Sequence, residues 1–139
     1  MKIFLKRLNE NYHFETRNER GDIVHLDNKS EPKPQGASPM ELLLMGIAGC
    51  SGIDIVMILK KQKIEPEDLQ MEVEGFRKEG AIPNVFTAIK MKVLLKGDFP
   101  PEKAKRAVDL SIEKYCSVAK MLEKTAEISY DVYLNGELV

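Results

Sequence analysis

Cys50 and Cys116 are the two cysteines of this sequence and its strongest candidates for covalent chemistry. A thiolate is a good nucleophile, and two thiols that meet can cycle between a dithiol and a disulfide. The two positions lie far apart in the chain, so the residues alone leave two alternatives open: the cysteines meet across the fold, or they lie in unrelated places. The two histidines, His13 and His25, fall on predicted strands, and no C-x-x-C or H-x-x-x-H spacing is present, so we expect no metal site.

The segment that carries Cys50, S-P-M-E-L-L-L-M-G-I-A-G-C-S-G-I-D-I-V-M-I-L at 38–59, is predicted to belong to a long helix that begins at Ser38 and ends near 62–64, before Pro66. It opens with a capping box, in which Ser38 is the N-cap, Pro39 takes the first helical position and Glu41 follows three residues after the cap. The residues after the cap are apolar on nearly every side, which predicts a helix that is buried all round. In such a setting the alternative to a reactive Cys50 is a small buried hydrophobe.

The segment that carries Cys116, K-Y-C-S-V-A, is predicted to be a break between two helices. The positive end of the short helix that follows would favour a thiolate at this position. Lys114 and Lys120 are also close in sequence. Cys116 is therefore the more suggestive of the two cysteines when each is considered alone.

The remaining elements predict an α+β fold in a single domain over 1–139. Alternation and turn residues predict strands over 2–8, 12–17, 22–26, 70–78, 86–96 and 127–134, a Pro-containing loop over 28–37, a second helix from 100 and a short helix over 118–124. We expect the strands on either side of 79–84 to form a hairpin.

The long helix is apolar enough to raise the alternative of a membrane span. Asp54 lies inside it, where a carboxylate is costly, and no second span is present, so we expect a core helix and no membrane association. Gly46, Gly49 and Gly52 lie on one slowly drifting side of the helix. Either they allow close approach by the helix of a second copy, or they accommodate side chains from the sheet; we expect a homodimer that packs through this helix.

Length and composition point to an ordinary globular protein. The 21 basic and 22 acidic residues leave a net charge of −1 with the signs interleaved, so we expect no nucleic-acid partner. The first residues, M-K-I-F-L-K-R-L, carry no signal-peptide pattern. Two cysteines in such a chain are expected to be reduced, and we expect a cytoplasmic location.

The two cysteine segments together resemble the OsmC/Ohr family of thiol peroxidases, which includes the organic hydroperoxide resistance proteins. The resemblance rests on 38–54 and on A-V-D-L-S-I-E-K-Y-C-S-V-A-K-M-L at 107–122, and the order of predicted elements fits over essentially the whole chain. It implies an intertwined homodimer, in which two long central helices pack back to back, predominantly antiparallel six-stranded sheets wrap over them, and the active sites lie at the dimer interface.

The resemblance also implies roles for the cysteines. Cys50 would be the peroxidatic thiolate, which attacks the O–O bond of a hydroperoxide and becomes a sulfenic acid. Cys116 would be the resolving thiol, which condenses with that sulfenic acid to a disulfide. An external dithiol reductant would restore both thiols, and no cofactor is required. The apolar surroundings of Cys50 favour organic hydroperoxides over hydrogen peroxide as substrates.

The sequence departs from the family pattern at two activating positions. The family places a glutamate ten residues before its first cysteine, where this chain has Met40; Glu41 lies nine residues before Cys50. That spacing gives about 13.5 Å of helical rise, so only a partner chain brings Glu41 near Cys50. The family also uses an arginine from the early strands, for which Arg17 is our choice because it ends a predicted strand.

Asp54 adds a further departure, because it lies one helical turn after Cys50 on the same face. A carboxylate there disfavours a thiolate, unless it serves as a structural hydrogen-bond acceptor for the thiol or for Ser51. We therefore keep two hypotheses for the function. The first is a hydroperoxide peroxidase that cycles Cys50 and Cys116. The second is a non-catalytic or redox-sensing homodimer that binds an apolar small molecule at the subunit interface.

Overall fold

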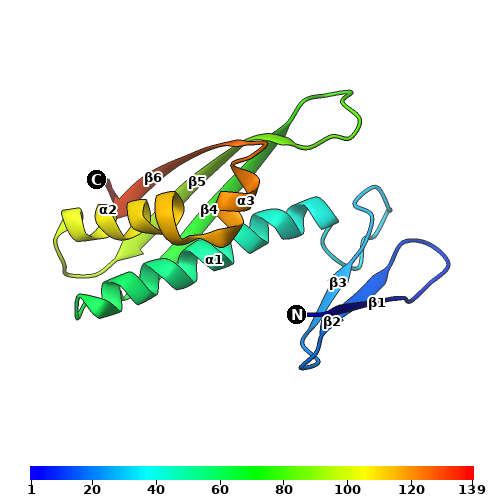
Figure 1. The fold of residues 1–139 in the computed structure, drawn as a ribbon, viewed down its shortest axis with the longest axis horizontal. Coiled ribbons are helices and arrows are strands. Elements are labelled where there is room, and N and C mark those ends of the chain that lie inside the picture. The colour runs from blue at the N-terminus through cyan, green and yellow to red at the C-terminus, as the bar shows by residue number, and fades with distance from the viewer. The chain divides into compact units, whose positions relative to one another are not determined.

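A computed structural model describes all 139 residues, which fall into two compact units, Met1–Leu43 and Leu44–Val139 (Figure 1). The first unit contains an antiparallel sheet of three strands in the order β1-β2-β3: β1 (Ile3–Arg7), β2 (Phe14–Asn18) and β3 (Ile23–Leu26). All three agree with the predicted strands to within about two residues at each end.

The second unit contains the remaining elements. They are most of α1 (Pro39–Lys61), β4 (Asp68–Arg77), β5 (Phe86–Lys96), α2 (Pro101–Leu110), the π-helical turn η1 (Ser111–Tyr115), α3 (Ser117–Leu122), β6 (Glu127–Leu134) and β7 (Glu137–Leu138). The mixed α+β class is confirmed. β7 and η1 were not predicted.

The predicted capping box starts α1 as expected. The backbone N–H of Ser38 donates to Glu41 Oε2 at 2.7 Å, and the backbone N–H of Glu41 donates to Ser38 Oγ at 3.3 Å. Two backbone donors that no helical carbonyl can reach are thereby satisfied. The helix then continues without interruption to Lys61.

The sheet of the second unit has the strand order β4-β5-β6-β7. β4 and β5 form the predicted antiparallel hairpin, whereas β5 and β6 are parallel, because the connection between them runs through α2, η1 and α3. The helices lie on one face of this sheet (Figure 1). Buried side chains alternate along β5 and meet those of α1 and α2; the core includes Ile47, Ile55, Leu59, Ile89, Met91, Val93, Leu95, Ala107, Val108 and Val132.

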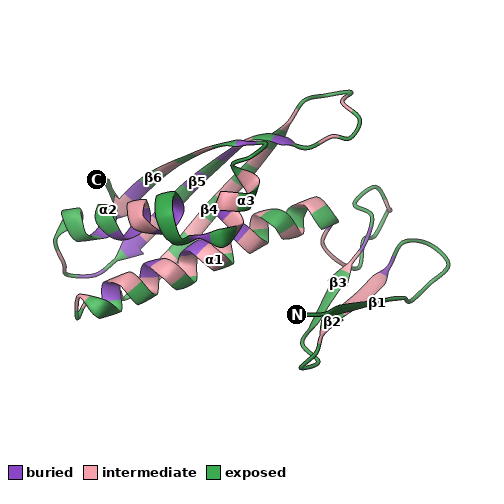
Figure 2. Cartoon of the chain, in the orientation of Figure 1, coloured by how far each residue is buried: buried purple, intermediate pink, exposed green.

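α1 buries only part of its surface within the chain (Figure 2). Met45, Ile53 and Met57 are 56%, 65% and 51% exposed, and a Cβ at Gly49 would meet no atom within 4 Å. By length and composition this helix could cross a membrane. One side of the helix packs in the core of the second unit through Ile47, Ile55 and Leu59. The exposed apolar residues form a strip on the opposite side.

The three glycines of α1 do not share one environment. A Cβ at Gly52 would lie 3.9 Å from the side chains of Leu69 and Met71 on β4, and a Cβ at Gly46 would lie 3.8 Å from Val118 on α3. These two accommodate side chains of the chain's own fold. Only Gly49 faces open space.

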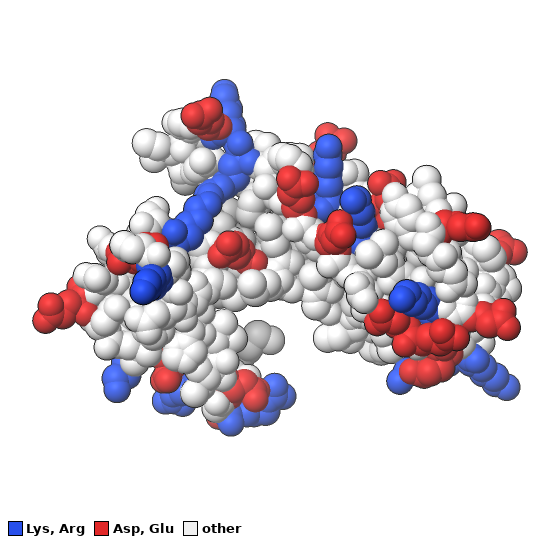
Figure 3. Space-filling view, turned by 180° about the vertical axis from the view of Figure 1, so that it is seen from behind, with Lys and Arg blue, Asp and Glu red and all other residues white.

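Charged side chains of both signs are interspersed on the face drawn in Figure 3. Neither positive nor negative charge dominates that face.

Candidate active site

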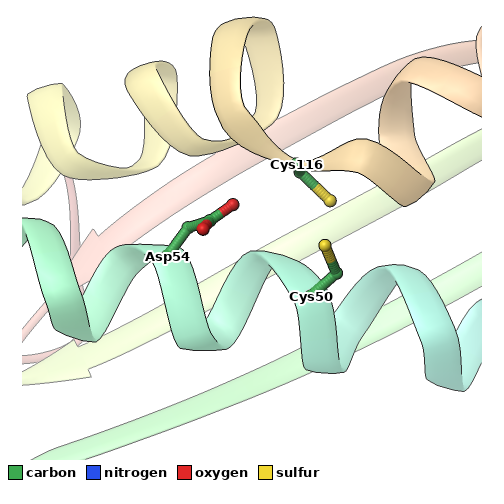
Figure 4. Close-up of side chains that lie close together, drawn as sticks. All are labelled: Cys50, Asp54 and Cys116. Carbon is green, nitrogen blue, oxygen red and sulfur yellow. The ribbon is translucent and has the colours of Figure 1, made fainter.

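Cys50 lies in the regular part of α1 and is half-buried. Asp54 follows one helical turn later, so both side chains leave the helix on the side that faces the η1–α3 segment (Figure 4). A regular, well-capped helix fixes the spacing between these two groups.

Cys116 lies where the second helical segment changes direction. η1 is a π-helical turn, and the backbone N–H of Cys116 donates to the Ser111 carbonyl at 2.7 Å. Cys116 itself is extended, with φ −66° and ψ 105°, and it is the N-cap of α3. The Ala119 backbone N–H donates to its sulfur at 3.4 Å. Turns of the π type often mark functional sites, and here the turn aims a buried thiol at α1.

Two buried serines connect the cysteine segments. Ser51 donates its hydroxyl hydrogen to Cys116 Sγ at 3.3 Å, and Ser111 donates to the Ser51 carbonyl oxygen at 3.2 Å. Ser51, Ser111 and Cys116 are all inaccessible to solvent. Buried polar groups are costly unless they are hydrogen-bonded, so this network fixes the position of the Cys116 sulfur relative to α1.

The fold brings the two sulfurs together with one carboxylate. Cys50 Sγ, Cys116 Sγ and a carboxylate oxygen of Asp54 all lie within 4.8 Å of one another, and the two sulfurs point toward each other (Figure 4). Of the two alternatives left open by the sequence, the cysteines therefore meet. Asp54 Oδ2 is buried and has no hydrogen-bond partner, so neither the thiols nor Ser51 serves it as a donor.

Burial raises the pKa of the Cys116 thiol above its usual value. The neighbouring Cys50 acts in the same direction on that pKa, while the hydrogen bonds from Ser51 and Ala119 oppose it. Burial dominates, so Cys116 is held as a neutral thiol over a wider pH range than a free cysteine.

A cavity of about 640 Å³ adjoins the site at Asp54. Its wall is apolar at Met57, Ile58, Leu110 and Tyr115, and it is polar or cationic at Lys61, Gln62, Lys103 and Arg106. It has the size and the mixed lining of a small-molecule site.

The two predicted activating residues belong to the first compact unit. Glu41 is engaged in the helix cap, and its hydrogen bonds with the Ser38 backbone and hydroxyl lower the pKa of its carboxyl. Arg17 is exposed, and its guanidinium lies 4.4 Å from the centroid of the Phe4 ring. Each therefore has a local partner within its own unit.

Sequence reasoning missed part of this arrangement. Ser111 occupies a position in the apolar stripe of a helix, and its only signal was a small polar residue in that stripe. Ser51 was considered as a partner of Asp54, whereas its hydroxyl donates to Cys116 instead.

Comparisons with known proteins match most of this chain. The family model of the OsmC-like proteins matches residues 31–131. Protein YhfA of Escherichia coli K12 is 44% identical over 115 residues, which cover 81% of this chain and 84% of YhfA.

Solved structures of similar fold extend the match to nearly the whole chain. A hypothetical protein from Aquifex aeolicus has a TM-score of 0.80 at 32% identity, covering 96% of both chains. The organic hydroperoxide resistance protein OhrB of Bacillus subtilis has a TM-score of 0.69 at 20% identity, covering 95% of this chain and 96% of that protein. This second likeness concerns the fold.

Proposed function

The chain belongs to the OsmC-like family, and from this premise we propose that it is a cysteine-based peroxidase that reduces organic hydroperoxides. The family is cysteine-based and needs no cofactor, and its members include proteins named for resistance to organic hydroperoxides. The observation that carries the proposal is the pair of opposed sulfurs, one half-buried and one fully buried, within 4.8 Å of each other.

In the proposed cycle the Cys50 thiolate attacks one oxygen of the hydroperoxide. The S–O bond forms as the O–O bond breaks, and the departing alkoxide takes a proton and leaves as an alcohol. Cys116 then attacks the sulfur of the Cys50 sulfenic acid, so the S–S bond forms and water leaves. An external dithiol reduces the disulfide and closes the cycle.

The surroundings of the two thiols support this division of roles. Cys50 is half-buried, and Asp54, one helical turn away, lines the cavity, which supports access of a substrate to the Cys50 thiol. Cys116 is fully buried and its sulfur is held by Ser51 and Ala119, which suits a thiol that meets only the sulfenic acid beside it.

The exposed strip on α1 supports a homodimer built on the pattern of the family. Met45, Ile53 and Met57 form an apolar surface around Gly49, and burying each side chain contributes about 1.5–3 kcal/mol. We propose that a second copy of the chain covers this strip. Each chain would contribute one OsmC-like domain over 1–139, and six-stranded sheets would wrap the paired helices. A cytoplasmic location, where the thiols stay reduced, belongs to the same proposal.

Glu41 and Arg17 remain the candidates for activating Cys50 in such a dimer. A Glu41→Gln or Arg17→Met variant would then lose reactivity toward peroxide at the first step, before the disulfide forms. Arg20→Met is the matched control for Arg17, because Arg20 pairs with the exposed Asp22 in a turn. An unchanged first step in both variants would remove these two residues from the mechanism.

The experiment that tests the proposal is a single-turnover thiol titration. Reduced protein receives one equivalent of cumene hydroperoxide or hydrogen peroxide, and free thiols and the non-reducing mass are followed with time. We expect both thiols to disappear within seconds, faster with the organic peroxide. Thiols that persist for many minutes with either oxidant would contradict the peroxidase.

The cavity beside Asp54 favours a second candidate function, a non-catalytic or redox-sensing homodimer that binds an apolar small molecule. Its volume of about 640 Å³ and its four apolar lining residues suit a small ligand with a polar end. This candidate predicts binding of an environment-sensitive apolar dye without consumption of peroxide. Leu110→Trp, which fills the cavity, should abolish dye binding.

A further inference from the structure

We propose that the reduced protein binds a thiophilic divalent cation, Zn²⁺ in the first instance, through Cys50, Asp54 and Cys116. The donors come from α1 and from the residue that follows η1, so they form no local sequence motif (Figure 4). The absence of C-x-x-C spacing, which led us to expect no metal site, does not bear on donors that the fold brings together.

The three donor atoms lie close enough together to share one metal ion. In a tetrahedral zinc site, Zn–S bonds of about 2.3 Å and Zn–O bonds of about 2.0–2.2 Å place neighbouring ligand atoms about 3.5–3.8 Å apart. The three donors lie within 4.8 Å of one another, so movements of about 1 Å bring them to bonding distance.

The orphaned carboxylate oxygen points to the same conclusion. Asp54 Oδ2 is buried and lacks any hydrogen-bond donor, although the carboxylate has an oxygen within 4.8 Å of both sulfurs. A buried carboxylate without a partner is costly, and a cation would satisfy it. Of the groups around it, the two sulfurs are the ones that would share such an ion.

Hydrogen bonds to Cys116 supply the outer support that metal-bound thiolates require. Ser51 Oγ and the Ala119 backbone N–H both donate to its sulfur, which favours the negatively charged ligand and fixes its orientation. Two thiolates and a carboxylate form a soft donor set that selects Zn²⁺ over Mg²⁺ or Ca²⁺. The cavity at Asp54 leaves room for a water as the fourth ligand.

The ion would bind only the reduced dithiol form and would compete with peroxide for the thiolates. It would not be a cofactor, since the family needs none. Resting on the proposed function, oxidation would release it. The two thiolates lose two electrons and form the S–S bond, the O–O bond of the peroxide breaks, and two protons complete the alcohol and water as Zn²⁺ leaves. The concentration of free Zn²⁺ would then rise when peroxide is present.

The test uses Co²⁺ as a spectroscopic probe for the Zn²⁺ site. Reduced full-length protein, titrated without peroxide, should take up a single Co²⁺ per chain and show the intense visible bands of a tetrahedral ion with thiolate charge-transfer absorption. Zn²⁺ should displace it, and the pre-formed disulfide should bind neither ion. Because no peroxide is present, a failed peroxidase assay leaves this result unaffected.

Variants separate the three-ligand site from casual thiol binding. Asp54→Asn should weaken Zn²⁺ binding more than about tenfold in a chelator competition, while Asp98→Asn, an exposed carboxylate in a loop, should leave it unchanged. Cys50→Ser should remove the tetrahedral spectrum with the far-ultraviolet circular dichroism intact. Wild-type protein without that spectrum, or an Asp54→Asn variant that binds as tightly as wild type, overturns the site.

Discussion

The two segments that carry the cysteines are built in opposite ways. Around Cys50, α1 is a regular helix with a complete cap, and the thiol is half-buried. Around Cys116, a π-helical turn, an extended residue and a new helix follow one another within a few residues, and the thiol is fully buried. The regular helix leaves the Cys50 sulfur partly accessible, whereas the irregular segment holds the Cys116 sulfur in place through hydrogen bonds.

This contrast bears on the different roles proposed for the two cysteines. A thiol that must meet a substrate needs access, which the surface of a helix provides. A thiol that must meet only its neighbour needs a fixed direction, which Ser51 and Ala119 supply to Cys116. The contrast therefore supports assigning the peroxidatic role to Cys50 and the resolving role to Cys116.

Replacing each cysteine by serine should give the largest and most unequal effects. We expect Cys50→Ser to lose peroxide reduction by at least about 10³-fold, because the attacking atom is gone. Cys116→Ser should still consume its first equivalent of peroxide and accumulate a Cys50 sulfenic acid, which dimedone labelling and intact mass would detect. Equal losses in the first turnover of both variants would contradict the division of roles.

The open strip on α1 gives the next effect. Ile53→Glu should weaken the proposed dimer by at least about 100-fold, because each of two copies would lose a buried side chain worth about 1.5–3 kcal/mol and gain a charge. Met121→Glu, a change at an equally exposed apolar residue on α3, is the matched control. Light scattering over a dilution series measures both, and a monomer–dimer equilibrium that Ile53→Glu leaves unchanged would remove this strip from the interface.

The two buried serines allow a smaller and sharper comparison. Ser51→Ala removes the hydrogen bond to the Cys116 sulfur, worth about 1 kcal/mol or about fivefold, so disulfide formation should slow by a few-fold after a normal first step. Ser111→Ala removes the donation to the Ser51 carbonyl and leaves the contact to sulfur intact. Stopped-flow oxidation followed by acid quench separates the steps, and equal rates for the two variants would show that the contact to sulfur is irrelevant.

The same contrast explains what the sequence could predict. Ser38, Pro39 and Glu41 predict the start of α1, and alternation predicts the long strands, because the interactions responsible are local. The distance between the two sulfurs depends on the crossover between β5 and β6, which no local pattern specifies. The sequence does not predict η1 either, and the hydrogen bond from its first residue, Ser111, to α1 joins segments far apart in the chain.

Local sequence patterns also do not predict β7 or the hydrogen-bonding environment of Asp54. β7 is a two-residue strand that exists only because β6 offers an edge for pairing. Asp54 was placed correctly on the face of Cys50, but helical spacing does not tell whether a donor reaches its carboxylate from another element. Tertiary contacts alone determine that it has none.

The smallest predicted effect concerns the cap that makes α1 regular. The Ser38 backbone N–H and hydroxyl lower the pKa of the Glu41 carboxyl, so the folded state favours its charged form. The resulting stabilisation is present above the unfolded pKa of about 4.3 and is lost as the pH falls through the lower folded pKa. Glu41→Gln keeps an acceptor for the Ser38 N–H, so its melting temperature should lie slightly below that of the wild type at pH 7 and should equal it in acid. A constant difference across that range would mean that the charge plays no part. Because the regular segment depends on several small terms of this kind, losing one of them should leave the position of Cys50 intact.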